Sequence, residues 1–429
     1  MFFLLDVVPK LDLSRFYAPY EKEPRGGPPF APPMMVLLRY AYCVGVFSSR
    51  KIALAGKRNL AFLAIVGADR PDFRPLSDFR KEHVEAFKDI FVQVVRLAGE
   101  AGLVKLGNVS TDGPKIQGNA SRHKAMSYGY MKQEVDRLGE EIEALVRQAH
   151  GQEEADDAAL GSRRGDELPE ELWRRETRLG KIEAALRRFD LAQRAAAEER
   201  QRRAEAEAAR RRTGEKRRGR EPKAVDDEPT DKAQMSFTDA EWHIMRMNNK
   251  GWEYCGNAQA SVDGAHQIIL ACEVTAEPND KKQAEPMAQA TRATVTHATI
   301  ERPTGAATGE PAAIPATLDN GYYSETAPEA LEQLGDDPYI AAGRIRHHEE
   351  APEEAEAPKT AKVRTEQGRE LSKQRKAIVE PVFGQIKEAR GFRRFSLRGL
   401  KKIRGEWRLV CLTHNLLKIW RYGGAQAIA

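Results

Sequence analysis

The sequence predicts an α/β protein, with a mixed sheet flanked by helices, a helical domain at the N-terminus and an inserted coiled-coil hairpin. Three observations support this fold class. Helical apolar spacing fills the first hundred residues, short strand-like runs break at glycine, and heptad-like spacing fills the middle of the chain. The predicted domains are residues 1–100 (helical, N-terminal), 101–130 (first part of the sheet domain), 131–223 (inserted hairpin) and 235–429 (remainder of the sheet domain).

Length and charge limit the classes of partner. A chain of 429 residues holds two or three domains with one sizeable core. The net charge is only +5, but the cations cluster at about 198–220 and 373–404, while acids cluster at 349–356. Local basic clusters favour a polyanion over an acidic protein as partner.

Cysteine usage and hydropathy indicate a cytoplasmic protein that does not enter a membrane. Cys43, Cys255, Cys272 and Cys411 lie far apart and match no zinc spacing, so we expect buried thiols of a reducing compartment. The longest apolar run, 34–47, is too short to span a bilayer and contains an arginine.

The first hundred residues read as a series of helices. Pro32 and Pro33 precede the apolar run 34–47, which is typical of a helix with proline in its first turn. Helices are expected next at 50–66 and at about 77–99. A helix-turn-helix that reads DNA and a plain helical bundle both fit this pattern. The DNA-reading alternative would use the cations Arg50, Lys51, Lys57 and Arg58.

Two aspartates end strand-like runs. Asp112 closes the run 103–112 before Gly113, and Asp319 closes the run 314–319 before Asn-Gly. Open α/β sheets bind ligands at the carboxyl ends of their strands, so both side chains are candidate site residues. For Asp112, an ordinary Asp-Gly turn is the alternative.

The middle of the chain predicts an antiparallel helical hairpin packed as a coiled coil. One helix carries apolar residues at 4-3-4-3 spacing and the other at 3-4-3 spacing. The basic run 210–220 at its end is a candidate for sequence-independent contact with DNA phosphates. The apolar positions are Met131, Val135, Leu138, Ile142 and Leu145, then Leu179, Ile182, Leu186 and Phe189.

Strand patterns resume after the linker. The runs 253–263 and 266–275 predict a β-hairpin across Gly264, with Asn257 and Gln259 on one face. A helix is expected at about 281–293 and a buried strand at 339–343.

A third carboxylate, Glu380, lies in an amphipathic helix near the C-terminus. Ile378, Val379, Val382, Phe383 and Ile386 give that helix a buried face, and Pro381 marks either its first turn or a kink. An exposed basic helix with an incidental glutamate is the alternative. The candidate DNA-binding cations in this region and beside Asp112 are Lys115, Arg375, Lys376, Lys387, Arg390, Arg393, Arg394 and Arg398.

Together Asp112, Asp319 and Glu380 form a candidate metal site. Hard oxygen donors suit Mg²⁺ or Mn²⁺ rather than zinc. Two such ions about 4 Å apart would activate the nucleophile and stabilise the leaving oxygen of an in-line phosphoryl transfer.

At this point the residues resemble a known family, the bacterial insertion-sequence transposases of the DDE type, which have an RNase H-like core. The resemblance implies that Asp112, Asp319 and Glu380 are catalytic metal ligands, that Lys387 contacts the terminal phosphate, and that a homodimer bridges both DNA ends. Three positions depart from the family pattern. Lys373 and Lys376 stand where tyrosine and arginine are usual, and Asn320 stands where a small residue is common. The motifs that carry the resemblance are Ser49-Arg-Lys-Ile, Asp112-Gly-Pro-Lys115, Asn257-Ala-Gln259, Asp319-Asn-Gly-Tyr322, Val379-Glu-Pro-Val-Phe-Gly-Gln-Ile-Lys387 and His414-Asn-Leu-Leu-Lys418.

The expected function is therefore cut-and-paste transposition: recognition of the terminal inverted repeats, hydrolysis of one strand, and attack of the freed 3′-hydroxyl on target DNA. Three alternatives remain: an RNase H-like nuclease, a non-catalytic DNA-binding or coiled-coil protein, and a shortened or decayed copy that only binds DNA. Tyr322 or Tyr323 is a candidate to stack on a flipped base, with a core tyrosine as the alternative.

Overall fold

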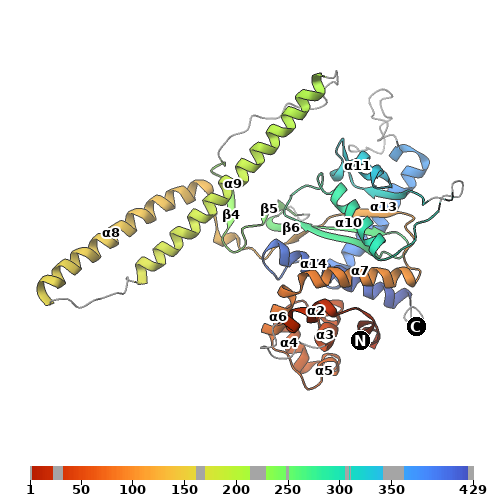
Figure 1. Ribbon diagram of the computed structural model, residues 1–429, viewed down its shortest axis with the longest axis horizontal. Coiled ribbons are helices and arrows are strands. Elements are labelled where there is room, and N and C mark those ends of the chain that lie inside the picture. Colours follow the sequence, from red (N-terminus) through yellow and green to blue (C-terminus); the bar gives the residue numbers. More distant parts are fainter. Residues whose placement is uncertain are drawn as a thin grey trace. The chain divides into compact units, whose positions relative to one another are not determined.

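The computed structural model describes residues 2–22, 32–160, 170–212, 229–247, 251–304, 309, 311–341 and 362–423. The fold contains helices and a mixed sheet, which confirms the predicted α/β class. It divides into two compact units, Met1–Asn119 with His243–Ala429, and Ala120–Trp242. Figure 1 shows both units.

The sheet of the first unit is built around the long strand β6 (Trp252–Asp263). Strand β6 runs antiparallel to β1 and β7, whereas β1, β8 and β9 run parallel to one another. The path β2-β6-β1-β8-β9 forms the sheet, with β5 and β7 paired to β6. The other strands are β1 (Val109–Asp112), β2 (Lys115–Gln117), β5 (His243–Arg246), β7 (Ile269–Thr275), β8 (Ile314–Leu318) and β9 (Asp336–Ile340).

The predicted β-hairpin across Gly264 is present as β6 and β7. The predicted strand 103–112 is shorter than expected, because only its last four residues form β1. Leu106 adopts a positive φ of 54°, and its backbone N–H donates to Asp263 Oδ1 at 2.7 Å. This left-handed residue keeps the preceding segment out of the ladder. The last predicted strand is also shifted, since β9 ends at Ile340.

Helices α7 and α14 lie side by side beneath the sheet (Figure 1). Helix α7 spans Val84–Glu100 and helix α14 spans Leu400–Tyr422. Three side chains of α14 bond directly to strand backbone. Arg404 Nε donates to the carbonyl oxygen of Val274 at 3.1 Å, and Trp407 Nε1 donates to that of Gln259 at 2.9 Å. Asn415 bonds both the N–H and the carbonyl oxygen of Ile269 at 2.8 Å. The C-terminal helix thus fixes the two central antiparallel strands.

The helices that precede α7 belong to the same compact unit as the sheet. The expected helix 50–66 is two helices, because the Asn59 side chain accepts hydrogen bonds from the N–H groups of Ala61 and Phe62 and starts a new helix. The expected helix 77–99 is likewise divided, at His83. The bounds are α1 (Phe2–Val7), η1 (Val8–Lys10), α2 (Ser14–Lys22), α3 (Pro32–Cys43), α4 (Ser49–Arg58), α5 (Leu60–Val66) and α6 (Phe73–Glu82).

Helix α13 (Glu366–Gly384) contains Pro381 in its interior, which excludes the first helical turn, one of the two alternatives for this proline. A proline leaves the carbonyl four residues earlier without its helical donor. Here the carbonyl of Ala377 accepts from Gln267 Nε2 at 3.1 Å, which offsets part of that loss. A π-helical turn, η5 (Gln385–Ala389), follows the helix.

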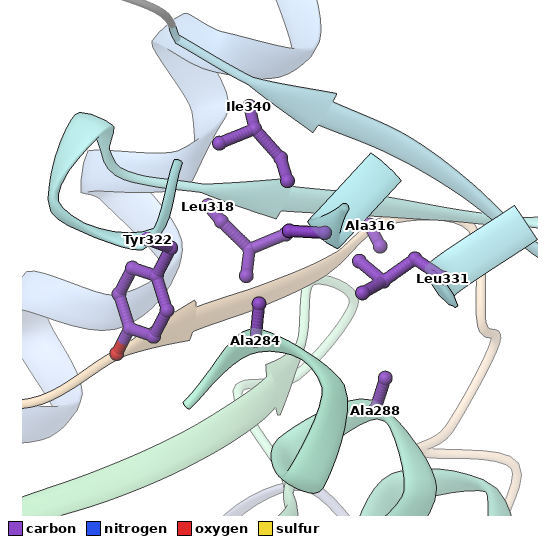
Figure 2. Close-up of a cluster of buried hydrophobic side chains, with 8 residues drawn as sticks. Ala284, Ala288, Ala316, Leu318, Tyr322, Leu331 and Ile340 are labelled. Atoms are coloured by element: carbon purple, nitrogen blue, oxygen red, sulfur yellow. The ribbon is translucent and has the colours of Figure 1, made fainter. Parts of the chain in front are cut away.

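A compact apolar cluster lies beside the strand that leads to Asp319 (Figure 2). Tyr322 is fully buried in it, which supports the core alternative for this tyrosine over base stacking. The cluster joins β8 and β9 to α10 (Ala284–His297), η3 (Asn320–Tyr322) and α11 (Ala327–Gln333). Its members are Ala284, Ala288, Ala316, Leu318, Tyr322, Ala327, Leu331 and Ile340. The short turn η4 (Lys362–Arg364) precedes α13.

The second unit contains two long helices and a small two-stranded sheet (Figure 1). The helices α8 (Tyr128–Leu160) and α9 (Glu170–Arg212) run antiparallel, because Tyr128 bonds Asp190 while Glu141 pairs with Arg175. Met131, Leu138, Ile182 and Ala185 form their buried core. The strands are β3 (Ala125–Ser127) and β4 (Gln234–Ser236), with η2 (Arg122–Lys124) before them.

Coiled-coil packing of this hairpin stays a prediction. Residues 213–220 of the basic run and the whole acidic cluster at 349–356 lie outside the described residues.

The cysteines agree in part with the expectation of buried thiols. Cys255, Cys272 and Cys411 are buried free thiols, and Cys43 is a free thiol that is partly exposed. Among the described residues, no helix is both long enough and apolar enough to cross a membrane.

Candidate active site

The two strand-end aspartates come together. Strands β1 and β8 are adjacent and parallel, with Thr111 opposite Leu318 in the register. Asp112 is the last residue of β1 and Asp319 is the first residue after β8. Parallel neighbours end at the same edge of a sheet, so their carboxylates meet there. The sequence pattern predicted this edge of the sheet as the site.

A single guanidinium joins the two carboxylates. Arg375 Nη1 lies 3.1 Å from Asp112 Oδ2, and Arg375 Nη2 lies 3.3 Å from Asp319 Oδ1. The Arg375 side chain is only 12% exposed, whereas Asp112 is 32% and Asp319 is 57% exposed. The arginine therefore lies deeper than the acids, and both acids keep access to solvent.

Burial dominates the electrostatics of Asp112. It raises the pKa of this carboxyl, and the nearby carboxylates of Asp319 and Asp280 raise it further. A hydrogen bond from the N–H of Gly113 at 2.8 Å and the charge of Arg375 act in the opposite direction. A cation beside Asp112 would offset the repulsion between this partly buried acid and the neighbouring carboxylates.

Two lysines border the pair. Lys115 on β2 has a side chain that is 15% exposed, and its Nζ lies 3.8 Å from Asp280 Oδ1. Lys387 lies in the π-helical turn η5. Burial lowers the pKa of both ammonium groups, while the Asp112 carboxylate counteracts this effect at each of them. Both predicted phosphate-binding lysines thus lie within the electrostatic reach of Asp112.

Glu380 is placed differently from the two aspartates. It lies on α13, the helix that carries Arg375, and its side chain is exposed between the buried residues Val379 and Val382. Within the described part of the chain, no group of three or more His, Cys, Asp or Glu side chains is arranged to hold a metal ion. The structure therefore assembles the aspartate pair, while the role of Glu380 stays a prediction.

The predicted DNA-binding cations divide into exposed and buried members. Lys376, Arg393, Arg394 and Arg398 are exposed. Arg390 is buried, and its guanidinium donates to Thr413 Oγ1 at 2.9 Å and to the Val410 carbonyl oxygen at 3.1 Å. The prediction that Arg390 contacts DNA is therefore corrected, because its charged head is used to bond α14.

Sequence reasoning missed one acid at this edge. Asp280, between β7 and α10, accepts hydrogen bonds from Asn257 Nδ2 at 2.6 Å and from Gln259 Nε2 at 2.8 Å. The two amides were recognisable as one face of β6, but nothing in the local pattern around residue 280 marked a carboxylate facing them.

The paired aspartates fit a hard divalent cation. They offer oxygen donors only, which suit Mg²⁺ and Mn²⁺. Both already share one positively charged group, Arg375, so their separation allows a common cation. Asp112 and Asp319 are the residues that would hold it.

Two family models match the chain, one toward each end. One is described as Transposase DDE domain and matches residues 341–420. The other is described as Transposase domain (DUF772) and matches residues 3–82. The first match includes Glu380 and Lys387, while Asp112 and Asp319 lie outside both. No curated protein and no solved structure matches the chain.

Fold and site define an α/β protein with an acidic site at the carboxyl edge of its sheet. The two matches give it transposase domains, so the resemblance to an insertion-sequence DDE transposase is confirmed. DDE transposases are enzymes that act on DNA and generally use divalent metal ions.

Proposed function

We propose that this transposase binds the ends of its insertion sequence and catalyses metal-dependent strand cleavage and strand transfer. One observation carries the proposal: Asp112 and Asp319 meet at the ends of adjacent parallel strands, in a chain with transposase domains. That placement is the one expected of metal-binding carboxylates in a phosphoryl-transfer enzyme.

The strand order supports an RNase H-like core. Strands β7, β6, β1, β8 and β9 are neighbours in that order. Strand β6 runs antiparallel to both of its neighbours in this series, and the remaining pairs are parallel. The proposed core comprises residues 101–130 and 235–429, with residues 131–223 as the inserted coiled-coil hairpin.

In the proposed chemistry, Asp112, Asp319 and Glu380 would hold the metal, which is expected to be two Mg²⁺ or Mn²⁺ ions. When bound, the metal would activate the attacking water or 3′-hydroxyl and stabilise the leaving oxygen. Lys115 and Lys387 supply positive charge beside Asp112, where they would neutralise and position the scissile phosphate. The first step frees a 3′-hydroxyl, and the second joins that hydroxyl to target DNA.

DNA binding is assigned to residues 1–100 and to the cations near α13. Helix α4 exposes Arg50, Lys51, Lys57 and Arg58, which supports the DNA-reading alternative for this helix. Phosphate contacts fix register on the duplex, while base contacts specify the end sequence. A homodimer that bridges both ends of the element in the cytoplasm completes the proposal. The cations near the site are Lys376, Lys387, Arg393, Arg394 and Arg398.

A cleavage assay on DNA that flanks the coding region tests this function. The wild-type chain is incubated with that DNA in Mg²⁺ and, separately, in Ca²⁺. We expect breaks at one defined boundary in Mg²⁺, and their loss in Glu380→Ala while boundary binding persists. Boundary binding without cleavage by the wild type would indicate a decayed copy. Neither boundary binding nor cleavage would contradict the proposed function.

A further inference from the structure

A network of polar side chains lies directly behind the aspartate pair, and Asp280 is its centre. Asp280 Oδ1 accepts from Asn257 Nδ2 at 2.6 Å and from Gln259 Nε2 at 2.8 Å, and it lies 3.8 Å from Lys115 Nζ. Both amide side chains belong to residues that are completely buried in β6. Buried amides need partners, so this carboxylate fulfils a structural requirement.

The carboxylate also determines which way the amides face. An ionised aspartate only accepts hydrogen bonds, so each amide must turn its nitrogen toward Asp280. The carbonyl oxygens then point elsewhere: Asn257 Oδ1 accepts from Gln259 Nε2 at 2.9 Å, and Gln259 Oε1 accepts from the Tyr322 hydroxyl. A hydrogen-bonded chain therefore leads from Asp280 through Gln259 to Tyr322.

Tyr322 connects this chain to the second aspartate. It is the last residue of η3, the turn that begins immediately after Asp319. Its N–H donates to the carbonyl oxygen of Asp319 at 3.0 Å, and its ring fills the apolar cluster beside β8 (Figure 2). Holding the hydroxyl of Tyr322 thus restrains the backbone that carries the Asp319 carboxylate.

The network contacts the first aspartate through its neighbouring glycine. A Cβ atom at Gly113 would lie 2.0 Å from Gln259 Nε2 and 2.8 Å from Asn257 Oδ1. The amides therefore pack against the backbone that follows Asp112, at a distance only glycine allows.

We propose that Asp280 is a positioning residue of the active site, which orients the Asn257 and Gln259 amides and thereby fixes the backbones that carry Asp112 and Asp319. It also holds the Lys115 ammonium beside Asp112. This inference rests on the proposed function, because it takes the two aspartates as the metal-binding pair. Asp280 itself contacts neither metal nor DNA in this account.

Two substitutions at Asp280 separate positioning from charge. Asp280→Ala removes one acceptor from each buried amide. Asn257 Nδ2 then keeps only the Glu277 carbonyl oxygen at 3.3 Å, and Gln259 Nε2 keeps only Asn257 Oδ1 at 2.9 Å. Asp280→Asn removes the charge but keeps an oxygen that can accept from both amides. If positioning is the role, Asp280→Ala lowers the single-turnover cleavage rate at the boundary about 10–100-fold, which is typical when a residue that orients metal ligands is removed. Asp280→Asn recovers most of that loss, and both variants bind the boundary DNA as the wild type does.

Mn²⁺ affinity provides a readout that does not need cleavage. We expect Asp280→Ala to weaken Mn²⁺ binding, measured by electron paramagnetic resonance, and Asp280→Asn to restore most of it. Tyr322→Phe removes only the hydroxyl at the far end of the chain and keeps the ring in the core. It is the matched variant if Asp280→Ala fails to fold, and it should reduce cleavage and Mn²⁺ affinity in the same direction.

The outcomes that contradict the inference differ from those that contradict the function. Wild-type cleavage and Mn²⁺ affinity in Asp280→Ala, or in Tyr322→Phe where the alanine variant does not fold, would overturn the positioning role. Equal loss in Asp280→Asn and Asp280→Ala would also overturn it, since charge would then matter rather than orientation. A wild-type chain that neither cleaves nor binds Mn²⁺ would instead contradict the proposed function.

Discussion

Arg375, on helix α13, donates to Asp112 with 3.1 Å between Nη1 and Oδ2, and its other terminal nitrogen pairs with Asp319. The guanidinium places a fixed positive charge between two acids that would otherwise repel each other. A divalent cation bound by both carboxylates would also place positive charge between them. Arg375 and a metal should therefore compete for the same pair of carboxylates.

Replacing this arginine should make the protein more dependent on metal. In Arg375→Gln the aspartates lose their shared counter-charge, so the metal-free protein should lose about 1 kcal/mol or less, given the exposure of both acids. Mg²⁺ should raise the midpoint of thermal unfolding more in the variant than in the wild type.

The matched control for that experiment is Arg393→Gln, which breaks an exposed pair with Glu388 away from the aspartates. It should respond to Mg²⁺ as the wild type does. An equal Mg²⁺ response in Arg375→Gln and the wild type would contradict competition at the site.

The glycine after Asp112 should be irreplaceable. Gly113→Ala would place a methyl group 2.0 Å from Gln259 Nε2, so either the hydrogen-bonded amides or the strand end must shift. We expect a loss of about 1–3 kcal/mol in the free energy of unfolding, together with loss of cleavage. The helical control Gly56→Ala meets no atom within 4 Å and should be neutral or stabilising. Urea unfolding compares them, and equal stability of the two variants would argue against the close contact.

Arg390 should matter for stability rather than for DNA. Arg390→Ala removes two hydrogen bonds to α14, to Thr413 and to the Val410 carbonyl, and should cost about 1–3 kcal/mol. The exposed Arg394→Ala should unfold like the wild type and weaken boundary binding. Chemical denaturation and a salt-dependent binding titration distinguish the two variants. Normal stability in Arg390→Ala would favour the original prediction that Arg390 contacts DNA.

Stability should fall on acidification, in part through His414. Burial in α14 lowers the pKa of this imidazole from 6.5 to about 3, and nearby Arg390 lowers it further. The unfolded chain then binds a proton that the folded chain does not, so the stabilisation is present above pH 6.5 and is lost as pH falls toward 3. Between pH 7.5 and 5.5 the expected loss is about 1.4 kcal/mol.

The measurement for His414 is the free energy of unfolding at those two pH values. His414→Gln keeps a donor for the Gln267 carbonyl, which lies 3.0 Å from His414 Nε2, but removes the titration. The variant should show a smaller difference between pH 7.5 and 5.5 than the wild type. The same difference in both proteins would exclude His414 as the cause.

The sequence predicted those features that depend on local pattern. The spacing of apolar residues and the breaks at turn residues predict three features: the strand ends at Asp112 and Asp319, the hairpin of β6 and β7, and the antiparallel helices α8 and α9. The break at Asn59 was missed because apolar spacing continues across it, while the cap depends on one side chain.

Features that depend on tertiary contacts could not be predicted from the sequence. The burial of Arg390 depends on α14, which lies beside it only in the folded chain. Asp280 becomes part of the site because β6 presents two amides to it, and no spacing rule joins residue 280 to residues 257 and 259. Arg375 was recognised as a cation, but its bridging position follows from how α13 packs on the sheet.

Under the proposed function, Asp112 and Asp319 form the catalytic pair. Single-turnover cleavage of boundary DNA in Mg²⁺ tests it most directly, with Asp112→Asn and Asp319→Asn compared against the exposed control Asp69→Asn. We expect each site variant to lose at least about 100-fold in rate while it binds the boundary DNA normally, and the control to cleave as the wild type does. Cleavage at the wild-type rate by either site variant would contradict the claim.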